Sequence, residues 1–499
     1  MYEQRRPFTR QRKIYLRIPA LFVGLIAASF LAESAQAVPA FARKYDVTCN
    51  ACHTRQPRLN AYGQSFLENG YQLPGTEDGA TTMKDLFGGP LNGVTLDAIS
   101  NFMAVRLRGD VQKADFREPT EATDDVEILF PNVINLFFAG TATKNIGFFI
   151  EGEYAPGEGH GGGLIFERAL LVFNNVASDS LGHQALNFKI GEFDPSSMYS
   201  FPTHRQQLNP VFPSAHTDDF PPEINRIPLL PLAFSSKMFG LTRGPETEGE
   251  EDFSILPFEP FLFNSPAETG ATVYGRPFGQ RFLYQIGTTQ QNTAEDEPDT
   301  SWDSYVMLRY DLMQGDYSAL QVSGFYYVAP DAARATLNPA GTPIFSTNTL
   351  DWTRWGVGAR WQYKFFDVYG TVIWDEIDAP IFGGAAATSE WDTDAMGVSL
   401  EADWLLNSKW LVGLRYDYMD PGGLVRLPPL LQGTDPPINQ KASFVGLIAK
   451  HYPVPNIALY GRAHINLESS EVLPAALGGD QHPARNLTSM ITIGVDMAF

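Results

Sequence analysis

Cys49, Cys52 and His53 form the motif of this sequence whose residue types and spacing indicate a specific chemistry, and the two cysteines are the only ones in the chain. Cys-x-x-Cys-His is the attachment signature of c-type haem, in which both thiols bond covalently to the macrocycle and the histidine ligates the iron. Two other uses compete. A disulfide would close a very small ring and constrain little of the chain, and a zinc site needs four ligands where three candidates are present. The motif therefore predicts one covalently bound haem c.

Residues 1–37 have the pattern of a secretory signal peptide. A basic N-terminal region precedes an apolar run over residues 18–32, and Ala35-Gln36-Ala37 fits the cleavage pattern. Cleavage there would change the formal net charge from −21 to about −25. The rest of the sequence has no stretch long and apolar enough for a transmembrane helix. We therefore expect an exported protein of the Gram-negative periplasm or outer membrane, where c-type haem is attached.

Most of the remaining sequence alternates apolar and polar residues with a period of two, as β-strands with one apolar face do. The clearest examples are 146–154, 354–363, 366–375 and 410–418. The chain also ends on such a strand, and its terminal residue is Phe499. A terminal phenylalanine in this position resembles the assembly signal of outer-membrane barrels.

A soluble β-sandwich would show the same alternation, but three features favour a membrane barrel. The apolar faces are rich in Trp, Tyr and Phe near strand ends, and the overall hydropathy is low. Tight connections at 364–365, 406–408 and 452–453 alternate with long ones rich in Pro, Gly and Asp. We predict an all-β fold, a transmembrane outer-membrane barrel of about 16 strands over residues 96–499. Its chain ends both lie in the periplasm, so the number of strands is even.

Residues 38–95 precede the barrel and carry the haem motif. Apolar residues at helical spacing predict one helix after the motif: Leu59, Tyr62, Phe66 and Leu67, with Gly70 at its end. So short a segment cannot build an independent core. We therefore predict that this monohaem cytochrome segment plugs the barrel, docking in its periplasmic mouth or lumen and using its walls.

The sixth ligand of the haem iron has several candidates. The segment 38–95 contains no second histidine, and Met83 is its nearest thioether, so we name Met83 as the candidate distal ligand. Met103 on the first strand and His464 on the polar face of a late strand are alternatives. Each also has an ordinary structural reading, the methionines as apolar fillers and His464 as a solvated lumen residue.

The N-terminal region resembles the outer-membrane fused cytochrome–porins. The stretches that carry the resemblance are 38–44, 49–53, 57–63 and 66–71. It implies a monohaem cytochrome joined to a barrel of about sixteen strands, with Cys49 and Cys52 attaching the haem and His53 as proximal ligand. The best-known members oxidise extracellular ferrous iron. The resemblance identifies no residue of this chain that would contact the ferrous iron substrate, because no motif of a donor site matches.

These features predict an electron conduit from an extracellular donor, Fe(II) or another small reductant, through the haem to a periplasmic cytochrome or other soluble carrier. The apolar band of such barrels is about 25 Å tall, more than one haem can bridge, so the donor must enter the lumen. Acid-rich stretches at 115–125 and 246–252 would concentrate cations, although acidic loops also serve only to solubilise a surface and bind bridging cations. His160 is either a transient metal ligand or an ordinary loop histidine.

Two other functions stay open. One is a solute porin in which the haem is structural or regulatory, and the other is an electron conduit for a donor other than iron. A wide, conducting lumen would favour the porin, whereas a plugged lumen with a redox-active haem would favour the conduit. The sequence shows no hydrolase or transferase constellation, so enzymatic activity, if any, is that of an Fe(II) oxidase. We expect outer-membrane lipid around the barrel and no nucleic-acid partner.

Overall fold

The structure is a computed structural model. It describes residues 40–55, 58–73, 99–116, 126–154, 164–193, 268–277, 281–290, 302–315, 318–329, 351–380, 390–420, 442–467 and 487–499. The predicted signal peptide, the candidate ligand Met83, His160, the acidic stretch 246–252 and most of the stretch 115–125 lie outside these residues. Among the described residues, no helix is both long enough and apolar enough to span a membrane.

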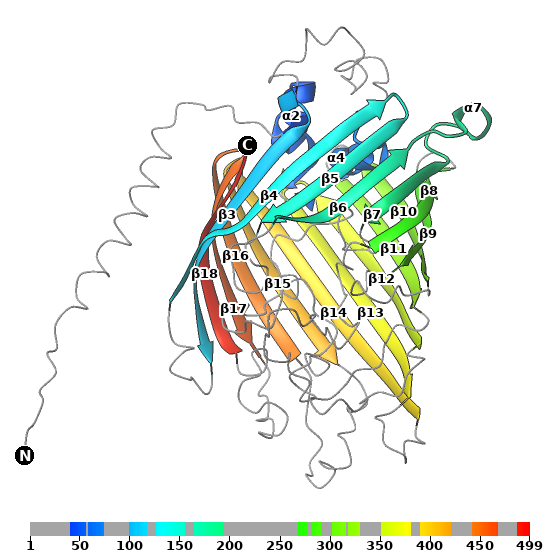
Figure 1. Ribbon diagram of the computed structural model, residues 1–499. Coiled ribbons are helices and arrows are strands. Elements are labelled where there is room, and N and C mark those ends of the chain that lie inside the picture. The colour runs from blue at the N-terminus through cyan, green and yellow to red at the C-terminus, as the bar shows by residue number, and fades with distance from the viewer. Residues whose placement is uncertain are drawn as a thin grey trace, which may run out of the picture.

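Sixteen antiparallel strands close into a barrel, as the sequence predicts (Figure 1). Every strand pairs with its neighbours in the sequence, and the last strand pairs with the first. The strands are β3 (Met103–Phe116), β4 (Glu127–Thr143), β5 (Ile146–Tyr154), β6 (Leu164–Phe173), β7 (Asn187–Phe193), β8 (Glu268–Gly275), β9 (Phe282–Gln290), β10 (Asp303–Gly315), β11 (Ser318–Ala329), β12 (Asp351–Tyr363), β13 (Phe366–Pro380), β14 (Glu390–Asn407), β15 (Trp410–Asp420), β16 (Ala442–Val454), β17 (Ile457–Asn466) and β18 (Leu487–Ala498). A short helix, α7 (Ser178–Leu181), lies between β6 and β7.

The two faces of the barrel wall differ in chemistry because the side chains of a strand alternate between them. Outward-facing residues are apolar and exposed, such as Val357, Leu414 and Ile491. Inward-facing residues are polar and buried, such as Arg360, whose guanidinium donates to Asp367 at 2.9 and 2.6 Å. Exposed aromatic residues gather at one rim: Trp361, Tyr363, Phe365, Phe366, Trp404 and Trp410. An apolar outer face, an aromatic rim and a polar interior define a transmembrane outer-membrane barrel.

Short and long connections lie at opposite ends of the barrel, called the short-turn end and the long-loop end below. The predicted tight turn at 364–365 is present between β12 and β13, and 408–409 joins β14 to β15. The prediction of a turn at 452–453 is wrong, because β16 continues to Val454 and the turn is Pro455-Asn456. A register shift between His451 and Val454 keeps the strand paired past Pro453.

Residues 40–73, called the plug below, lie at the short-turn end, where Figure 1 shows α2 and α4 beside the ends of the strands. The plug contains α2 (Ala40–Tyr45), α3 (Cys49–Cys52), β1 (His53–Arg55), β2 (Arg58–Leu59) and α4 (Ala61–Glu68). The predicted helix is therefore α4, but it excludes Leu59, which pairs with His53 in the small sheet of β1 and β2. Asn69 caps α4, and Gly70 follows in the left-handed region at φ 65°.

Arg58 fixes one side of the plug to the barrel wall and is 1% exposed. Its guanidinium pairs with Asp403 at 2.5 Å, with Asp367 at 3.5 Å and also with Glu401. It lies 4.2 Å from the ring centre of Tyr369. Burial acts to lower the pKa of Arg58, but these neighbours more than offset it and hold the pKa well above its usual value. Arg58 is therefore charged and bound to an acidic part of the wall.

Glu68 fixes the other side of the plug with the opposite sign. Its carboxylate accepts from Arg276 at 2.5 Å and from Arg309 at 2.7 Å. Burial acts to raise the pKa of Glu68, but the two guanidinium groups outweigh it and lower the pKa. The hydroxyl of Tyr274 also donates to the Glu68 carbonyl at 2.9 Å. Arg58 and Glu68 thus bind residues of opposite charge on two different parts of the barrel wall.

Candidate functional site

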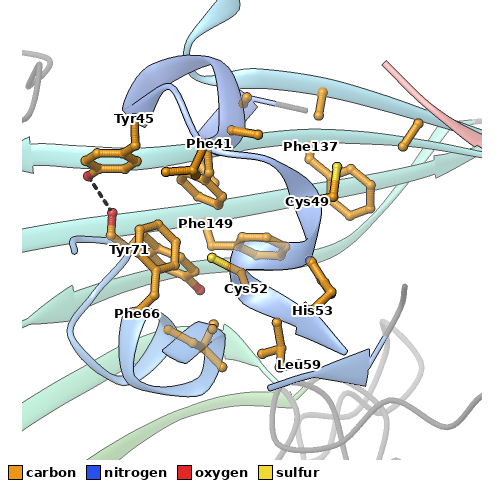
Figure 2. Close-up of a pocket in the computed structure, with 18 of the residues that line it drawn as sticks. Phe41, Tyr45, Cys49, Cys52, His53, Leu59, Phe66, Tyr71, Phe137 and Phe149 are labelled. Carbon is orange, nitrogen blue, oxygen red and sulfur yellow. Dashed lines mark hydrogen bonds between the residues drawn. The ribbon is translucent and has the colours of Figure 1, made fainter. Parts of the chain in front are cut away.

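The Cys-x-x-Cys-His motif of residues 49–53 lies in α3 and the first residue of β1, beside a cavity between the plug and the barrel wall. Cys49, Cys52 and His53 all line this cavity, so the structure brings the three predicted residues together (Figure 2). The cavity has an empty volume of about 1430 Å³, including the part that opens to solvent.

The cavity walls come from both ends of the chain. The plug contributes α2, α3 and α4, and the barrel contributes β3, β4, β5 and the end of β18. Most of the lining side chains are apolar or aromatic: Phe41, Tyr45, Leu59, Phe66, Leu67, Tyr71, Phe102, Phe137 and Phe149. Such a lining suits a large apolar ligand.

Aromatic contacts join the plug to the wall along one side of the cavity. The ring of Phe41 lies 4.9 Å from Phe66 and 5.7 Å from Tyr71, centre to centre. Tyr71 in turn stacks on Phe149 of β5 at 5.6 Å, and Tyr45 donates a hydrogen bond to the Tyr71 carbonyl at 3.2 Å. Figure 2 shows these rings around the two cysteines. The plug therefore completes its apolar core with side chains of the barrel, as its small size requires.

Asn60 ties helix α4 to the attachment motif. Its side-chain oxygen accepts from the amide of Gly63 at 2.9 Å and caps α4. Its side-chain nitrogen donates to the Ala51 carbonyl at 2.9 Å, and its backbone amide donates to the Cys52 carbonyl at 2.9 Å. Sequence reasoning missed this role. The available signal was an asparagine directly before a helix, which is a preferred capping residue.

Gly63 lets α4 approach the motif closely. A Cβ atom on Gly63 would lie 2.0 Å from the Cys52 carbonyl oxygen and 2.9 Å from the Cys52 Cα. The obstructing atoms belong to backbone, so no side-chain rotation relieves the clash. A larger residue at this position must separate α4 from α3.

Replacing Gly63 by alanine is therefore expected to destabilise the plug by about 1–3 kcal/mol, the usual cost of overpacking. The measurements are the yield of covalently bound haem and the rate at which a protease cuts within residues 40–73. Gly461→Ala is the matched control, because a Cβ there meets nothing within 4 Å. Equal haem yield and protease resistance in the two variants would contradict the role assigned to Gly63.

Burial keeps both thiols in their neutral form. It raises the pKa of Cys49, and burial together with the neighbouring Cys49 raises the pKa of Cys52 to about 11. Neither cysteine forms a disulfide. Among the described residues, no group of three or more His, Cys, Asp or Glu side chains is arranged to hold a metal ion. Two thiols and an imidazole line an apolar aromatic cavity, and no further ligand is grouped with them among the described residues, so they fit a covalently bound haem better than a four-ligand zinc centre.

The three candidates for the sixth ligand differ in their positions. Met83 lies outside the described residues. Met103 is 45% exposed and does not line the cavity, whose walls at this point are Phe102 and Ala104. His464 is buried on β17 but does not line the cavity either.

No family model matches the sequence, and no curated protein matches it either. Solved structures similar to this chain are outer-membrane barrels. An anion-selective porin from Comamonas acidovorans is 14% identical, with 80% of this chain and 98% of that chain covered and a TM-score of 0.46. Salmonella typhi OmpF is 11% identical, with 80% and 97% covered and a TM-score of 0.46. The outer-membrane channel DcaP of Acinetobacter baumannii is 10% identical, with 80% and 96% covered and a TM-score of 0.45.

Proposed function

We propose that this protein is an electron conduit of the outer membrane. It takes electrons from an extracellular donor, Fe(II), and delivers them through a haem c to a soluble periplasmic carrier. The observation that carries the proposal is the position of Cys49, Cys52 and His53 on an apolar cavity inside one mouth of a closed barrel. The resemblance of the N-terminal region to the fused cytochrome–porins supports the same function.

The orientation of the barrel follows from its connections. Outer-membrane barrels have short periplasmic turns and longer extracellular loops, so we assign the short-turn end to the periplasm. The plug then lies on the periplasmic side, and the donor approaches from the long-loop end. A carrier reaches the plug from the short-turn end without entering the membrane.

Each part of the site has a distinct role in this proposal. A haem bound there would supply a centre that accepts and gives up one electron at a time. Cys49 and Cys52 would hold the macrocycle, and His53 would ligate its iron. The aromatic walls give the site an apolar lining, and the ion pairs of Arg58 and Glu68 keep the plug seated in the barrel.

The state of the lumen supports a conduit over a solute porin. The plug occupies the short-turn end, and inward-facing side chains along the barrel are also buried, among them Thr289, Ser399 and Glu401, each no more than 1% exposed. We expect little or no steady conductance when the protein is placed in a planar lipid bilayer. A large, voltage-stable conductance would instead favour the porin with a structural haem.

Fe(II), added anaerobically to the haem-loaded protein in liposomes, is expected to produce the absorption band of reduced haem. Neutralising the acidic stretches 115–125 and 246–252 should slow this reduction more at low salt than at high salt. The reason is that screening shortens the reach of surface charge from about 30 Å at 0.01 M salt to about 10 Å at 0.1 M.

A small organic reductant is the control for a redox-active haem. If it reduces the haem while Fe(II) fails at every accessible pH, the donor is not iron, and a conduit for another reductant takes its place. If neither reagent reduces the haem, the conduit itself is wrong.

A further inference from the structure

The wall of the cavity beside the attachment motif carries its charge at one point. Arg106 of β3 and Asp496 of β18 line the cavity, and the other lining residues that the structure describes have no permanent charge. The guanidinium of Arg106 donates from Nε and Nη2 to the two carboxylate oxygens of Asp496, at 2.8 and 2.6 Å. A ligand in this cavity therefore meets largely apolar and aromatic walls except at this ion pair.

The ion pair lies at the inner end of the cavity, away from the short-turn end. β3 begins at that end with Met103, and Arg106 is the lining residue farthest along this strand. β18 runs in the opposite direction, and Asp496 is likewise the lining residue that lies farthest from the short-turn end. Arg106 is in register with Asn135 of β4, a buried polar residue of the lumen. The cavity thus changes from apolar beside the plug to charged where it meets the polar lumen.

Arg106 has N–H donors that Asp496 does not use. A guanidinium has five N–H groups, and Asp496 accepts from one on Nε and one on Nη2. Nη1 makes no hydrogen bond to any residue that the structure describes. The Arg106 side chain is also 19% exposed. It can therefore bind a second carboxylate within the cavity while Asp496 holds the guanidinium in place.

Asp496 does not cancel the attraction of this part of the wall for an anion, because Arg106 is not its only cation. Arg108 and Lys450 also act electrostatically on Asp496. The other anions around the pair each have a partner of their own: Asp110 with Arg108, Glu151 with Arg168, Asp403 and Glu401 with Arg58, and the terminal carboxylate of Phe499 with the Val105 amide.

We propose that Arg106 binds a propionate carboxylate of the haem attached at Cys49 and Cys52, and that Asp496 positions the guanidinium. The proposal rests on the proposed function in one respect, since both require haem at the motif. A carboxylate taken out of water needs a charged or hydrogen-bonding partner, and a guanidinium matches it in geometry and charge. The apolar part of the haem then lies among the aromatic rings, and its carboxylates are turned toward the lumen, from which the donor arrives.

Resonance Raman spectroscopy of the full-length, haem-loaded protein in detergent tests the proposal. The bending vibration of the haem propionates depends on the hydrogen bonds that their carboxylates accept. We expect this band to shift when Arg106→Met is combined with Asp496→Asn, because the variant removes the donor. The second substitution prevents Asp496 from being left as an uncompensated buried charge. Heat-modifiable migration shows that the barrel of the variant is folded.

Arg415→Met with Asp417→Asn is the matched control. Arg415 binds both oxygens of Asp417 at 2.6 and 2.8 Å, so the two pairs have the same geometry. Neither residue lines the cavity, and the propionate band should stay at its position in the parent protein. Arg106→Lys is a milder second variant, because it keeps the charge without the fork of the guanidinium. Its band should lie between those of the parent and the Arg106→Met, Asp496→Asn variant.

A propionate band at the same frequency in the parent and in both Arg106 variants would overturn the proposal. It would mean that the carboxylates lie elsewhere, for example in solvent at the mouth of the cavity. An equal shift in the Arg415 control would overturn it too, because the effect would then be general to the lumen. Neither result depends on the electron donor, so the conduit could stand while this proposal fails. A parent protein without covalent haem would overturn both.

Discussion

Replacing Cys49 and Cys52 together by alanine is expected to remove all covalently bound haem from the protein. The reason is that these are the only two cysteines of the chain and that haem c is attached through two thiols. The measurement is haem staining after denaturing electrophoresis, in which only covalently held haem stays with the chain. A stained band in the double variant would show that the attachment assigned to α3 is wrong.

Two controls separate attachment from folding and from ligation. The double variant should keep the heat-modifiable migration of a folded barrel, because α3 takes no part in the strand pairing. His53→Ala should keep some covalent haem but lose most of the low-spin absorption spectrum, since it removes the proximal ligand. Loss of the folded barrel in the cysteine variant would mean that the motif acts in assembly instead.

Replacing Arg58 by methionine is expected to unseat the plug. Asp403 would lose the buried cation that it pairs with, whereas Asp367 would keep Arg360 and Glu401 would keep Arg415. Breaking a buried pair by removing one partner typically costs about 3–5 kcal/mol, because the remaining charge is left uncompensated. We expect rapid proteolysis within residues 40–73 and the appearance of ionic conductance through the barrel.

A rescue experiment tests whether charge is the cause. Adding Glu401→Gln and Asp403→Asn to Arg58→Met removes two of the three carboxylates that Arg58 pairs with and should restore much of the protease resistance. Arg58→Lys keeps the charge without the forked geometry of the guanidinium. Its protease resistance should lie between that of the parent protein and that of the methionine variant. Unchanged proteolysis and conductance in Arg58→Met would show that the aromatic contacts alone hold the plug.

The barrel could be predicted from the sequence because its signal is local. Alternation with a period of two is visible in single segments such as 354–363, and the structure places their faces as expected. The turn at Pro455-Asn456 was missed because a register shift extends β16, and pairing irregularities leave no mark on the alternation. The number of strands therefore follows from the alternation of apolar and polar residues. The residue at which a strand ends depends on its pairing with the neighbouring strand.

The seating of the plug could not be predicted in the same way. Arg58 and Glu68 look like ordinary surface charges in the sequence, and their partners lie more than 200 residues away. Leu59 has helical spacing with Tyr62 and Phe66, yet it pairs with His53 in a strand. The motif at Cys49–His53 was recognisable because its spacing alone specifies the chemistry, but its cavity depends on residues from the far end of the chain.

The cavity lies against the seam where the barrel closes. Its lining includes Arg106 of β3 and Asp496 of β18, which are paired at 2.8 and 2.6 Å. Phe499 and Val105 exchange backbone hydrogen bonds of 2.8 and 3.1 Å beside it. Because β18 follows the plug in the sequence, the plug is synthesised before the strand that completes the wall of its cavity. The absorption spectrum of a group attached to Cys49 and Cys52 would therefore change when β18 pairs with β3 and closes the barrel. This change would serve to follow the assembly of newly synthesised protein.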